Sequence, residues 1–191
     1  MIKVPSYNKD NRRQIREQLP KGGYVCKIMS IESRTNKNGK EMVVIFFDIA
    51  EGEFKDFYAN QYKANTSEDK KWSNDATYYM TIPYDDCEAY ITKNWDTFWA
   101  DVEDSNNGYV FDGNEKTVKG KTFGGVFRIE EREYNGTTYT NTRLAYSVVA
   151  QNIRDGKYKP ANDKLLDHSS SGSSDSSFME IPEDAVNDLP F

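Results

Sequence analysis

Residues 42–49 read Met42-Val43-Val44-Ile45-Phe46-Phe47-Asp48-Ile49, an almost continuous apolar run that is rich in β-branched and aromatic side chains. Such a run predicts a β-strand that is covered on both sides. Just before it, Asn36-Lys37-Asn38-Gly39 supplies the asparagine and glycine that tolerate the positive φ of a hairpin turn. Residues 24–31, which precede this turn, are therefore the expected partner strand.

The segment after this hairpin combines strand and helix patterns. Residues 53–62 are expected to continue into a third strand, and residues 78–82 to form a short strand. Pro83-Tyr84-Asp85-Asp86 favours a helix start, with proline in the first turn and acids near the positive end of the helix. Apolar side chains then recur at three- and four-residue spacing as far as Val102, which predicts an amphipathic helix. Its stripe should pack in the core through Trp95, Phe98 and Trp99.

Two more strands are expected at residues 120–133 and 139–150, joined by the turn signal Asn135-Gly136, with residues 151–166 extending the second. The Gly124-Gly125 pair favours a bend or a close approach of backbones. Three strands, a helix and two strands is the element order of the OB-fold. We therefore expect a mainly β protein with an OB-fold-like five-stranded Greek-key barrel and one amphipathic helix between strands three and four. The alternative is an unrelated α+β domain with an antiparallel sheet.

Composition restricts the function classes. The chain has 191 residues, 14% of them aromatic, and a net charge of −6. The aromatic content predicts a folded core. Two cysteines and one histidine argue against a disulfide scaffold, a Cys/His zinc site and histidine-based catalysis, and we expect no cofactor. With no apolar run long enough to span a membrane and no signal-peptide pattern, a cytoplasmic location is expected.

The sequence divides into an N-terminal arm (1–18), an OB-like domain (19–166) and a flexible Ser-rich linker with an acidic tail (167–191). Residues 169–191 hold five acids and no base, so the remainder of the chain is near neutral. The tail has the properties of a short linear ligand, with apolar side chains for a pocket, a proline that lowers the ordering entropy and acids for a basic rim. The residues concerned are Asp184, Asp188, Leu189, Pro190 and Phe191. The alternative is a solubilising end, although an apolar tip suits that role poorly.

The ending Asp188-Leu189-Pro190-Phe191 resembles the acidic tip of bacterial single-stranded DNA-binding proteins, which typically ends Asp-Ile-Pro-Phe. The body resembles single-stranded DNA-binding proteins of phages and mobile elements of Gram-positive bacteria, over most of residues 19–166. The segments that carry this resemblance are 19–25, 47–53, Lys70-Lys71-Trp72 and Gly120-Lys121. It implies an OB-fold that coats single-stranded DNA in a bacterial host cell and a tail that recruits replication or recombination proteins. The tip departs from the pattern by its leucine and its sparse acids. The body departs by its long region between strands two and four, so the oligomeric state does not carry over and a homo-oligomer stays open.

Binding of single strands without sequence preference needs basic side chains along the phosphates and aromatic faces on which bases stack. Aromatic residues next to basic residues are therefore the candidates for DNA contact, together with the basic residues of the first hairpin loop. They are Trp72, Tyr58, Tyr62, Lys55, Lys63, Lys70, Lys71, Arg34, Lys37, Lys40, Arg128, Arg132, Tyr134, Tyr139 and Arg143. Structural alternatives stay open for several of them. Trp72 could pack beneath its loop, Tyr58 and Tyr62 could be barrel residues, and Arg128 and Arg132 could pair with neighbouring glutamates.

The leading hypothesis is a non-catalytic single-stranded DNA-binding protein that acts in phage or mobile-element replication or recombination. A second hypothesis is a phage-encoded protein-interaction adaptor that does not bind DNA. A third is an aromatic-rich carbohydrate-binding domain. The enzyme alternative is a nuclease in which acids such as Asp48, Glu51 and Glu53 hold Mg²⁺, but the sequence contains no complete metal-binding pattern.

Overall fold

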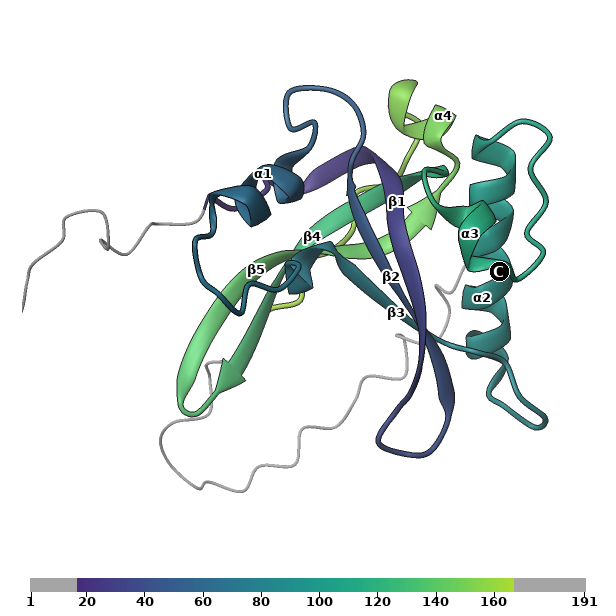
Figure 1. The fold of residues 1–191 in the computed structure, drawn as a ribbon, viewed down its shortest axis with the longest axis horizontal. Helices are drawn as coiled ribbons and strands as arrows, with labels where there is room; N and C mark the ends of the chain where they lie inside the picture. Colours follow the sequence, from purple (N-terminus) through teal and green to yellow (C-terminus); the bar gives the residue numbers. More distant parts are fainter. Residues whose placement is uncertain (1–16, 167–191) are drawn as a thin grey trace, which may run out of the picture.

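A computed structural model describes residues 17–166 of the chain. Most of the expected N-terminal arm and the whole of the linker and tail, with all five predicted tail residues, lie outside the described residues. The described part is mainly β: a five-stranded antiparallel sheet in the order β3-β2-β1-β4-β5, accompanied by helices (Figure 1). Among residues 17–166, no helix is both long and apolar enough to cross a membrane.

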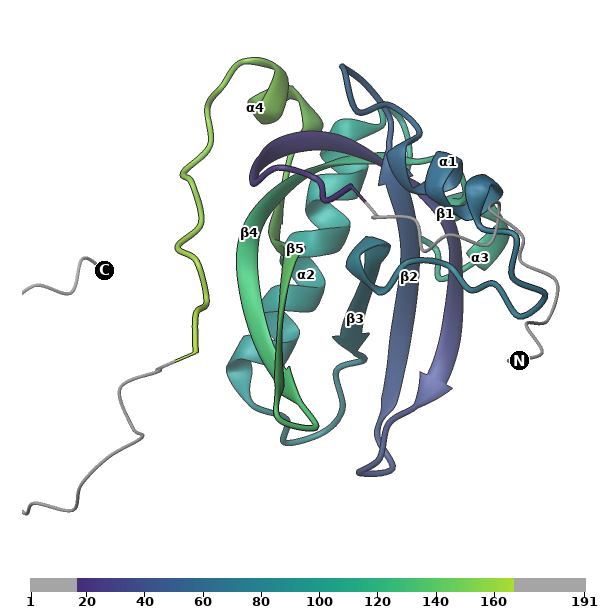
Figure 2. The same ribbon diagram turned by 90° about the vertical axis from the view of Figure 1, so that its left-hand side faces the viewer.

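Two long hairpins build most of the sheet. Strands β1 (Gly22–Thr35) and β2 (Glu41–Ile49) form the first, and β4 (Thr122–Tyr134) and β5 (Thr137–Val148) form the second. Both predicted Asn-Gly turns are confirmed. Gly39 has a φ of 73°, and Asn135 and Gly136 have φ values of 50° and 71°, in the left-handed region that such turns require. The turns of both hairpins lie at the lower side of the molecule in the two perpendicular views (Figures 1 and 2).

The expected strand at residues 53–62 is wrong. The chain turns after β2 and forms helix α1 (Phe57–Ala64). The side chain that caps this helix comes from β2, where the buried carboxylate of Asp48 accepts hydrogen bonds from the N–H groups of Tyr58 and Ala59 at 2.9 and 3.1 Å. Helix N-termini leave such donors unpaired, so a carboxylate placed there stabilises the helix.

The short strand expected at residues 78–82 is confirmed as β3 (Thr77–Thr81), which pairs with β2 and follows the short 3-10 helix η2 (Asn74–Ala76). The predicted helix begins later than expected, as α2 (Ala89–Ser105). A turn intervenes in which the Cys87 N–H bonds the Tyr84 carbonyl and Asp86 has a φ of 60°. A further short helix, α3 (Glu115–Val118), precedes β4.

The core lies between the sheet and α2, which packs against β3, β4 and β5. Alternate residues of β2, from Val43 to Ile49, face this core, together with Phe123 and Phe127 of β4. From α2, Phe98, Trp99 and Val102 are buried as the apolar stripe predicted, and Trp95 packs against them partly buried. Complete burial of each large apolar side chain contributes about 1.5–3 kcal/mol.

Gly124 and Gly125 lie where neighbouring segments approach the β4 backbone closely, as the sequence predicted. A Cβ on Gly124 would lie 2.7 Å from Ile153 Cγ1 and 2.9 Å from the Val148 carbonyl oxygen. Nearby, the pairing register skips Ala145, so Leu144 lies opposite Phe127 while Tyr146 lies opposite Val126. This bulge removes Tyr146 from the face of Leu144, contrary to simple alternation.

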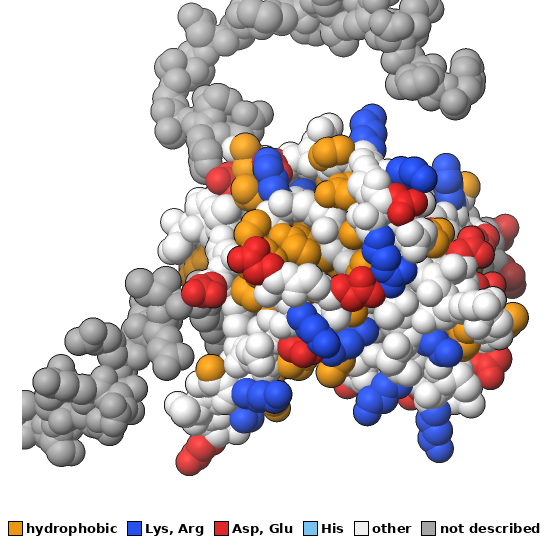
Figure 3. Space-filling view, turned by 90° about the horizontal axis from the view of Figure 1, so that it is seen from above, with side chains coloured by type: hydrophobic (Ala, Val, Ile, Leu, Met, Phe, Trp, Pro, Cys, Tyr) orange, Lys and Arg blue, Asp and Glu red, His pale blue; other side chains and the backbone are white. Residues whose placement is uncertain are grey.

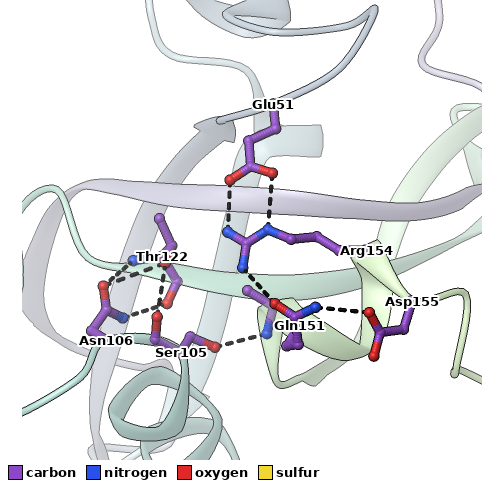
Figure 4. A network of polar contacts seen from close by, with 8 residues as sticks. Glu51, Ser105, Asn106, Thr122, Gln151, Arg154 and Asp155 are labelled. Carbon is purple, nitrogen blue, oxygen red and sulfur yellow. Dashed lines mark hydrogen bonds and ion pairs between the residues drawn. The ribbon is translucent and has the colours of Figure 1, made fainter.

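The expected extension of the last strand through residues 151–166 is also wrong. The chain forms helix α4 (Ala150–Arg154), and its continuation then runs back to β4, where Lys164 makes a parallel bridge with Glu130. Figure 4 shows how α4 is held. Arg154 binds both carboxylate oxygens of Glu51, and the Ala150 N–H donates to Ser105 Oγ at the end of α2. These contacts connect the loop after β2, the end of α2 and the start of α4.

Replacing Asp48 with alanine is expected to lower the free energy of unfolding by about 2–4 kcal/mol, because two buried backbone N–H groups and one partly buried N–H group lose their acceptor. Urea denaturation followed by circular dichroism measures this change. The matched control is Glu53→Ala, an exposed acid in the same loop, which should stay within about 0.5 kcal/mol of wild type. Equal effects of the two substitutions would contradict the capping role.

Candidate nucleic-acid interface

Three of the predicted residues form one group, which we call the Trp72 cluster: Tyr62, Lys70 and Trp72. The ring centroids of Tyr62 and Trp72 are 5.8 Å apart, and Lys70 Nζ lies 4.8 Å from the centre of the Tyr62 ring. Both rings are partly exposed, and Trp72 Nε1 donates to the Ala76 carbonyl at 3.2 Å. Trp72 therefore packs on its loop and still contributes to a surface where an ammonium group adjoins aromatic rings.

The turn η2 joins this cluster to β5. Arg143 donates from Nε to Asp75 Oδ1 at 3.3 Å and from its terminal nitrogen to the Asn74 carbonyl at 3.0 Å. The guanidinium is largely buried, with 15% of its side chain exposed, so the contact fixes two segments that are far apart in the sequence. Arg143 is thus a positioning residue at the edge of the Trp72 cluster.

The β4–β5 hairpin carries the other predicted residues of this region. Arg128 lies directly opposite Arg143, and Arg132 directly opposite Tyr139, so each pair projects from the same face. Tyr134 and Tyr139 are 69% and 49% exposed. Arg132 pairs with Glu130 at 3.3 Å, and Lys164 binds the same carboxylate. Although burial acts against ionisation, these two cations hold the pKa of Glu130 below its usual value.

The first hairpin contributes a second surface. Arg34 lies at the end of β1, pairs with Glu32 at 2.6 Å and has its guanidinium carbon 5.9 Å from the centre of the Phe46 ring. Lys40 Nζ lies 3.8 Å from the centre of the Tyr84 ring, and Lys37 is exposed in the turn. These residues are separate from the Trp72 cluster in the sequence and in the contacts they make.

Sequence reasoning missed the residues that connect the two surfaces. On the side of the sheet away from the core, the register brings Phe46 opposite Thr77 and places Tyr79 opposite Val44. We call the outward side chains Arg34, Met42, Phe46 and Tyr79 the β2–β3 face. Tyr79 is 45% exposed, and Met42 and Phe46 are partly exposed, so β2 is not fully covered on both sides as its apolar run predicted. Residues 42–47 are all apolar, so the sequence offers no alternation that separates the outward side chains from those that face the core.

Phe46 lies opposite the first residue of β3, immediately after η2. The β2–β3 face, η2 and the β4–β5 hairpin are consequently connected in space. Lys37 and Lys40 lie in the turn of the first hairpin, and Tyr134 and Tyr139 lie beside the turn of the second. On the face at the top of Figure 1, by contrast, basic and acidic side chains are interspersed (Figure 3).

Tyr58 does not belong to this surface. Its side chain is buried, with 3% of the residue exposed, and its ring packs at 6.2 Å from that of Phe47. Burial raises the pKa of its phenol, and among the described residues Oη has no hydrogen-bond partner. Of the two alternatives for Tyr58, the structure therefore gives the core residue, whereas Tyr62, one helical turn later, reaches the surface.

The remaining predicted lysines lie before, within and after α1. Lys55, Lys63 and Lys71 are exposed. Asp56 forms an ion pair with Lys27, and its pKa is lowered by that hydrogen bond and by the charges of Lys27, Lys55 and Lys63. Asp56 therefore offsets part of the positive charge at the start of α1.

The acids proposed for a nuclease have other partners. Asp48 is fully buried and holds α1, and its pKa is raised by burial in spite of its backbone hydrogen bonds. Glu51 pairs with Arg154 at 2.7 Å. Within the described part of the chain, no group of three or more His, Cys, Asp or Glu side chains is placed to hold a metal ion.

No protein-family model matches the sequence, and no curated protein matches it.

Replacing Arg143 with glutamine is expected to cost about 1–2 kcal/mol of unfolding free energy and to speed amide hydrogen exchange in residues 72–77, because η2 loses its link to β5. Hydrogen exchange with mass spectrometry measures the second effect. Arg34→Gln is the control, since it removes an exposed ion pair that contributes at most about 1 kcal/mol. Unchanged exchange around η2 in Arg143→Gln would show that the link does not position this segment.

Proposed function

We propose that the protein is a non-catalytic single-stranded DNA-binding protein. The observation that carries this proposal is the connection, through η2, of two aromatic groups that each adjoin a basic side chain. One is the Trp72 cluster with Lys70, and the other is the β2–β3 face with Arg34. Aromatic faces stack with bases of any kind, and basic side chains follow the phosphates, so this combination suits binding without sequence preference.

We also propose that the sheet is an OB-fold-like barrel. The strand order β3-β2-β1-β4-β5 and the position of α2 and α3 between β3 and β4 support this assignment. OB-folds bind oligonucleotides on the face of strands two and three and on the two neighbouring hairpin loops. In this proposal, the exposed aromatic residues of the β2–β3 face and the residues at both hairpin turns correspond to that binding surface.

Each part of this surface has a proposed task. Phe46, Tyr79 and Trp72 offer ring faces to the bases. The phosphates are contacted by cations on either side: Lys37 and Lys40 at the first hairpin, Lys70 and Lys71 beside Trp72, and the half-buried Arg128 with the exposed Arg132 on the second hairpin. Tyr134 and Tyr139 extend the aromatic surface along that hairpin. A duplex would bind poorly, because its bases are stacked on one another and cannot reach the rings.

The acidic tail supports a second part of the proposal. Its tip, Asp188-Leu189-Pro190-Phe191, is proposed to recruit replication or recombination proteins of a phage or mobile element in the cytoplasm of a bacterial host. An apolar pocket with a basic rim is the chemistry that would recognise Leu189, Phe191 and the nearby acids. In this division of labour the sheet binds DNA and the tail binds protein.

Fluorescence anisotropy with a labelled oligo-dT of about 30 nucleotides tests DNA binding, with a duplex of equal length as the control ligand. Wild type should bind the single strand more tightly, and the affinity should fall as salt rises. Tyr79→Ala and Trp72→Ala should each weaken binding by roughly 5- to 150-fold, since stacking contributes about 1–3 kcal/mol per base. Tyr90→Ala is the matched control, because Tyr90 is 58% exposed on α2, outside this surface.

Two results would overturn the proposal. If wild type binds no single strand even at low salt, the sheet is not a DNA-binding surface, and the adaptor hypothesis takes its place. If Tyr90→Ala weakens binding as much as Tyr79→Ala, the β2–β3 face is not the site.

Deleting Leu189, Pro190 and Phe191 is expected to leave DNA affinity equal or higher, because the tail is acidic and competes with DNA for basic side chains. The same anisotropy titration measures the change, with Ser176→Ala and Ser177→Ala in the linker as the control. A large loss of DNA affinity in the deletion would contradict the division of labour between sheet and tail.

A further inference from the structure

The β4–β5 hairpin extends beyond the rest of the sheet. Strand β1 pairs with β4 only as far as Phe127, whereas β4 and β5 stay paired up to Tyr134 and Thr137. Beyond Phe127, these two strands therefore form a long ribbon (Figure 1). A two-stranded ribbon is marginally stable in water by itself, so the partners of its two edges matter.

The β4 edge of this ribbon is paired within the chain. The N–H of Lys164 donates to the Ile129 carbonyl at 2.9 Å, and its carbonyl accepts from the Glu131 N–H at 2.8 Å. The backbone groups of Ile129 and Glu131 thus point away from β5. In an antiparallel ladder, the residues opposite them, Thr142 and Thr140, then point their own backbone groups away from β4.

The backbone groups on the outer edge of β5 belong to every second residue. Thr138 and Thr140 are exposed and direct their N–H and C=O groups outward, while Thr142 is buried. Gln18 Nε2 donates to the Thr140 carbonyl at 2.5 Å, which agrees with this direction. Among residues 17–166, no backbone hydrogen bond from outside the β4 ladder reaches Thr138 or Thr140.

This exposed edge of β5 lacks the usual protection against pairing. Natural sheets protect an edge with charged side chains, proline, a bulge or a very short strand. Residues 134–142 carry no charge and no proline, and the bulge of β5 lies further along, at Ala145. Tyr139, in the middle of the edge, is 49% exposed. An uncharged edge of this kind repels no identical strand, so a second copy of the chain is the partner that it fits.

We infer that two copies of the protein associate through their β5 edges, in an antiparallel pair centred on Tyr139. In this register, Thr138 of one copy lies opposite Thr140 of the other, and each such pair exchanges both of its N–H···O bonds about a twofold axis. The two Tyr139 residues form the central non-hydrogen-bonded pair, in which side chains approach most closely. The Thr140 carbonyl has two lone pairs, so it accepts from the second copy as well as from Gln18. The inference does not depend on DNA binding.

Charged substitutions at Tyr139 test both the edge and the register. Sedimentation velocity of the full chain, without DNA, measures association between about 1 and 300 µM, and wild type should form dimers in this range. Tyr139→Lys and Tyr139→Glu should each weaken association at least about tenfold, because like charges then lie directly opposite each other. An equimolar mixture of these two variants should associate again, because opposite charges then meet at the centre.

The matched controls are Tyr90→Lys and Tyr90→Glu, since Tyr90 is 58% exposed on α2. Both should sediment as wild type does. A wild type that stays monomeric throughout the concentration range would overturn the inference. Equal effects of the Tyr90 and Tyr139 variants would place the contact elsewhere, and a mixture of the Tyr139 variants that stays monomeric would rule out this register; either result also overturns it.

A backbone substitution tests the hydrogen bonds themselves. Thr140→Pro removes an outward N–H and leaves the β4 ladder complete, because proline is tolerated where the N–H faces away from the sheet. It should weaken association at least about fivefold, whereas Thr140→Ala, which keeps the N–H, should not. Circular dichroism checks that the proline variant is folded; if it is not, the Tyr139 variants decide. A folded Thr140→Pro that associates like wild type would overturn the inference.

Discussion

The buried carboxylate of Asp48 holds the region between β2 and β3 in place. Its two oxygens accept hydrogen bonds from the backbone N–H groups of Ile49, Tyr58 and Ala59. A fully buried carboxylate is costly unless it is hydrogen-bonded, and these donors, with the nearby charge of Lys27, provide the compensation. Because this contact fixes the start of α1 to the end of β2, it also fixes Tyr62 and Gln61 further along the same helix. The placement of Tyr62 in the Trp72 cluster and the hydrogen bond from Gln61 to the Glu17 carbonyl thus depend on one side chain inside the fold.

Arg143 fixes η2 to β5, just as Asp48 fixes the start of α1 to β2. Strand β3 lies at one edge of the sheet and β5 at the other, so no ladder of backbone hydrogen bonds joins them. The guanidinium of Arg143 crosses this gap to the backbone and side chain of η2. A planar group with several donors suits that task, because it binds a carboxylate and a carbonyl at once. This contact joins η2 to β5, although Arg143 lies 68 and 69 residues from its two partners in the sequence.

The sequence predicted those elements whose signals are local. The Asn-Gly turns identified both hairpins, and the apolar spacing in residues 87–102 identified α2 and its buried aromatic residues. Helix α1 was missed because its capping carboxylate is Asp48, in another element, so no capping pattern appears beside the helix. The difference between Tyr58 and Tyr62 was beyond sequence reasoning for the same reason: both belong to one helix, and only the way that helix lies on β2 buries the first. The β2–β3 face was missed because a continuous apolar run conceals which residues face outward until the neighbouring strand sets the register.

Charge is divided between the two sides of the sheet in a way that suits a polyanionic ligand. Residues 85–115, which include α2 and the loops around it, hold nine acids and a single base, Lys93. The bases near the β2–β3 face and the hairpins are partly offset by Glu32, Asp56 and Glu130, each paired with a cation. Those pairs reduce the net positive charge of this surface, whereas residues 85–115 carry a net negative charge. In the proposed function, this division of charge would favour the approach of a DNA strand to the sheet, and stacking on exposed rings would supply the preference for single strands.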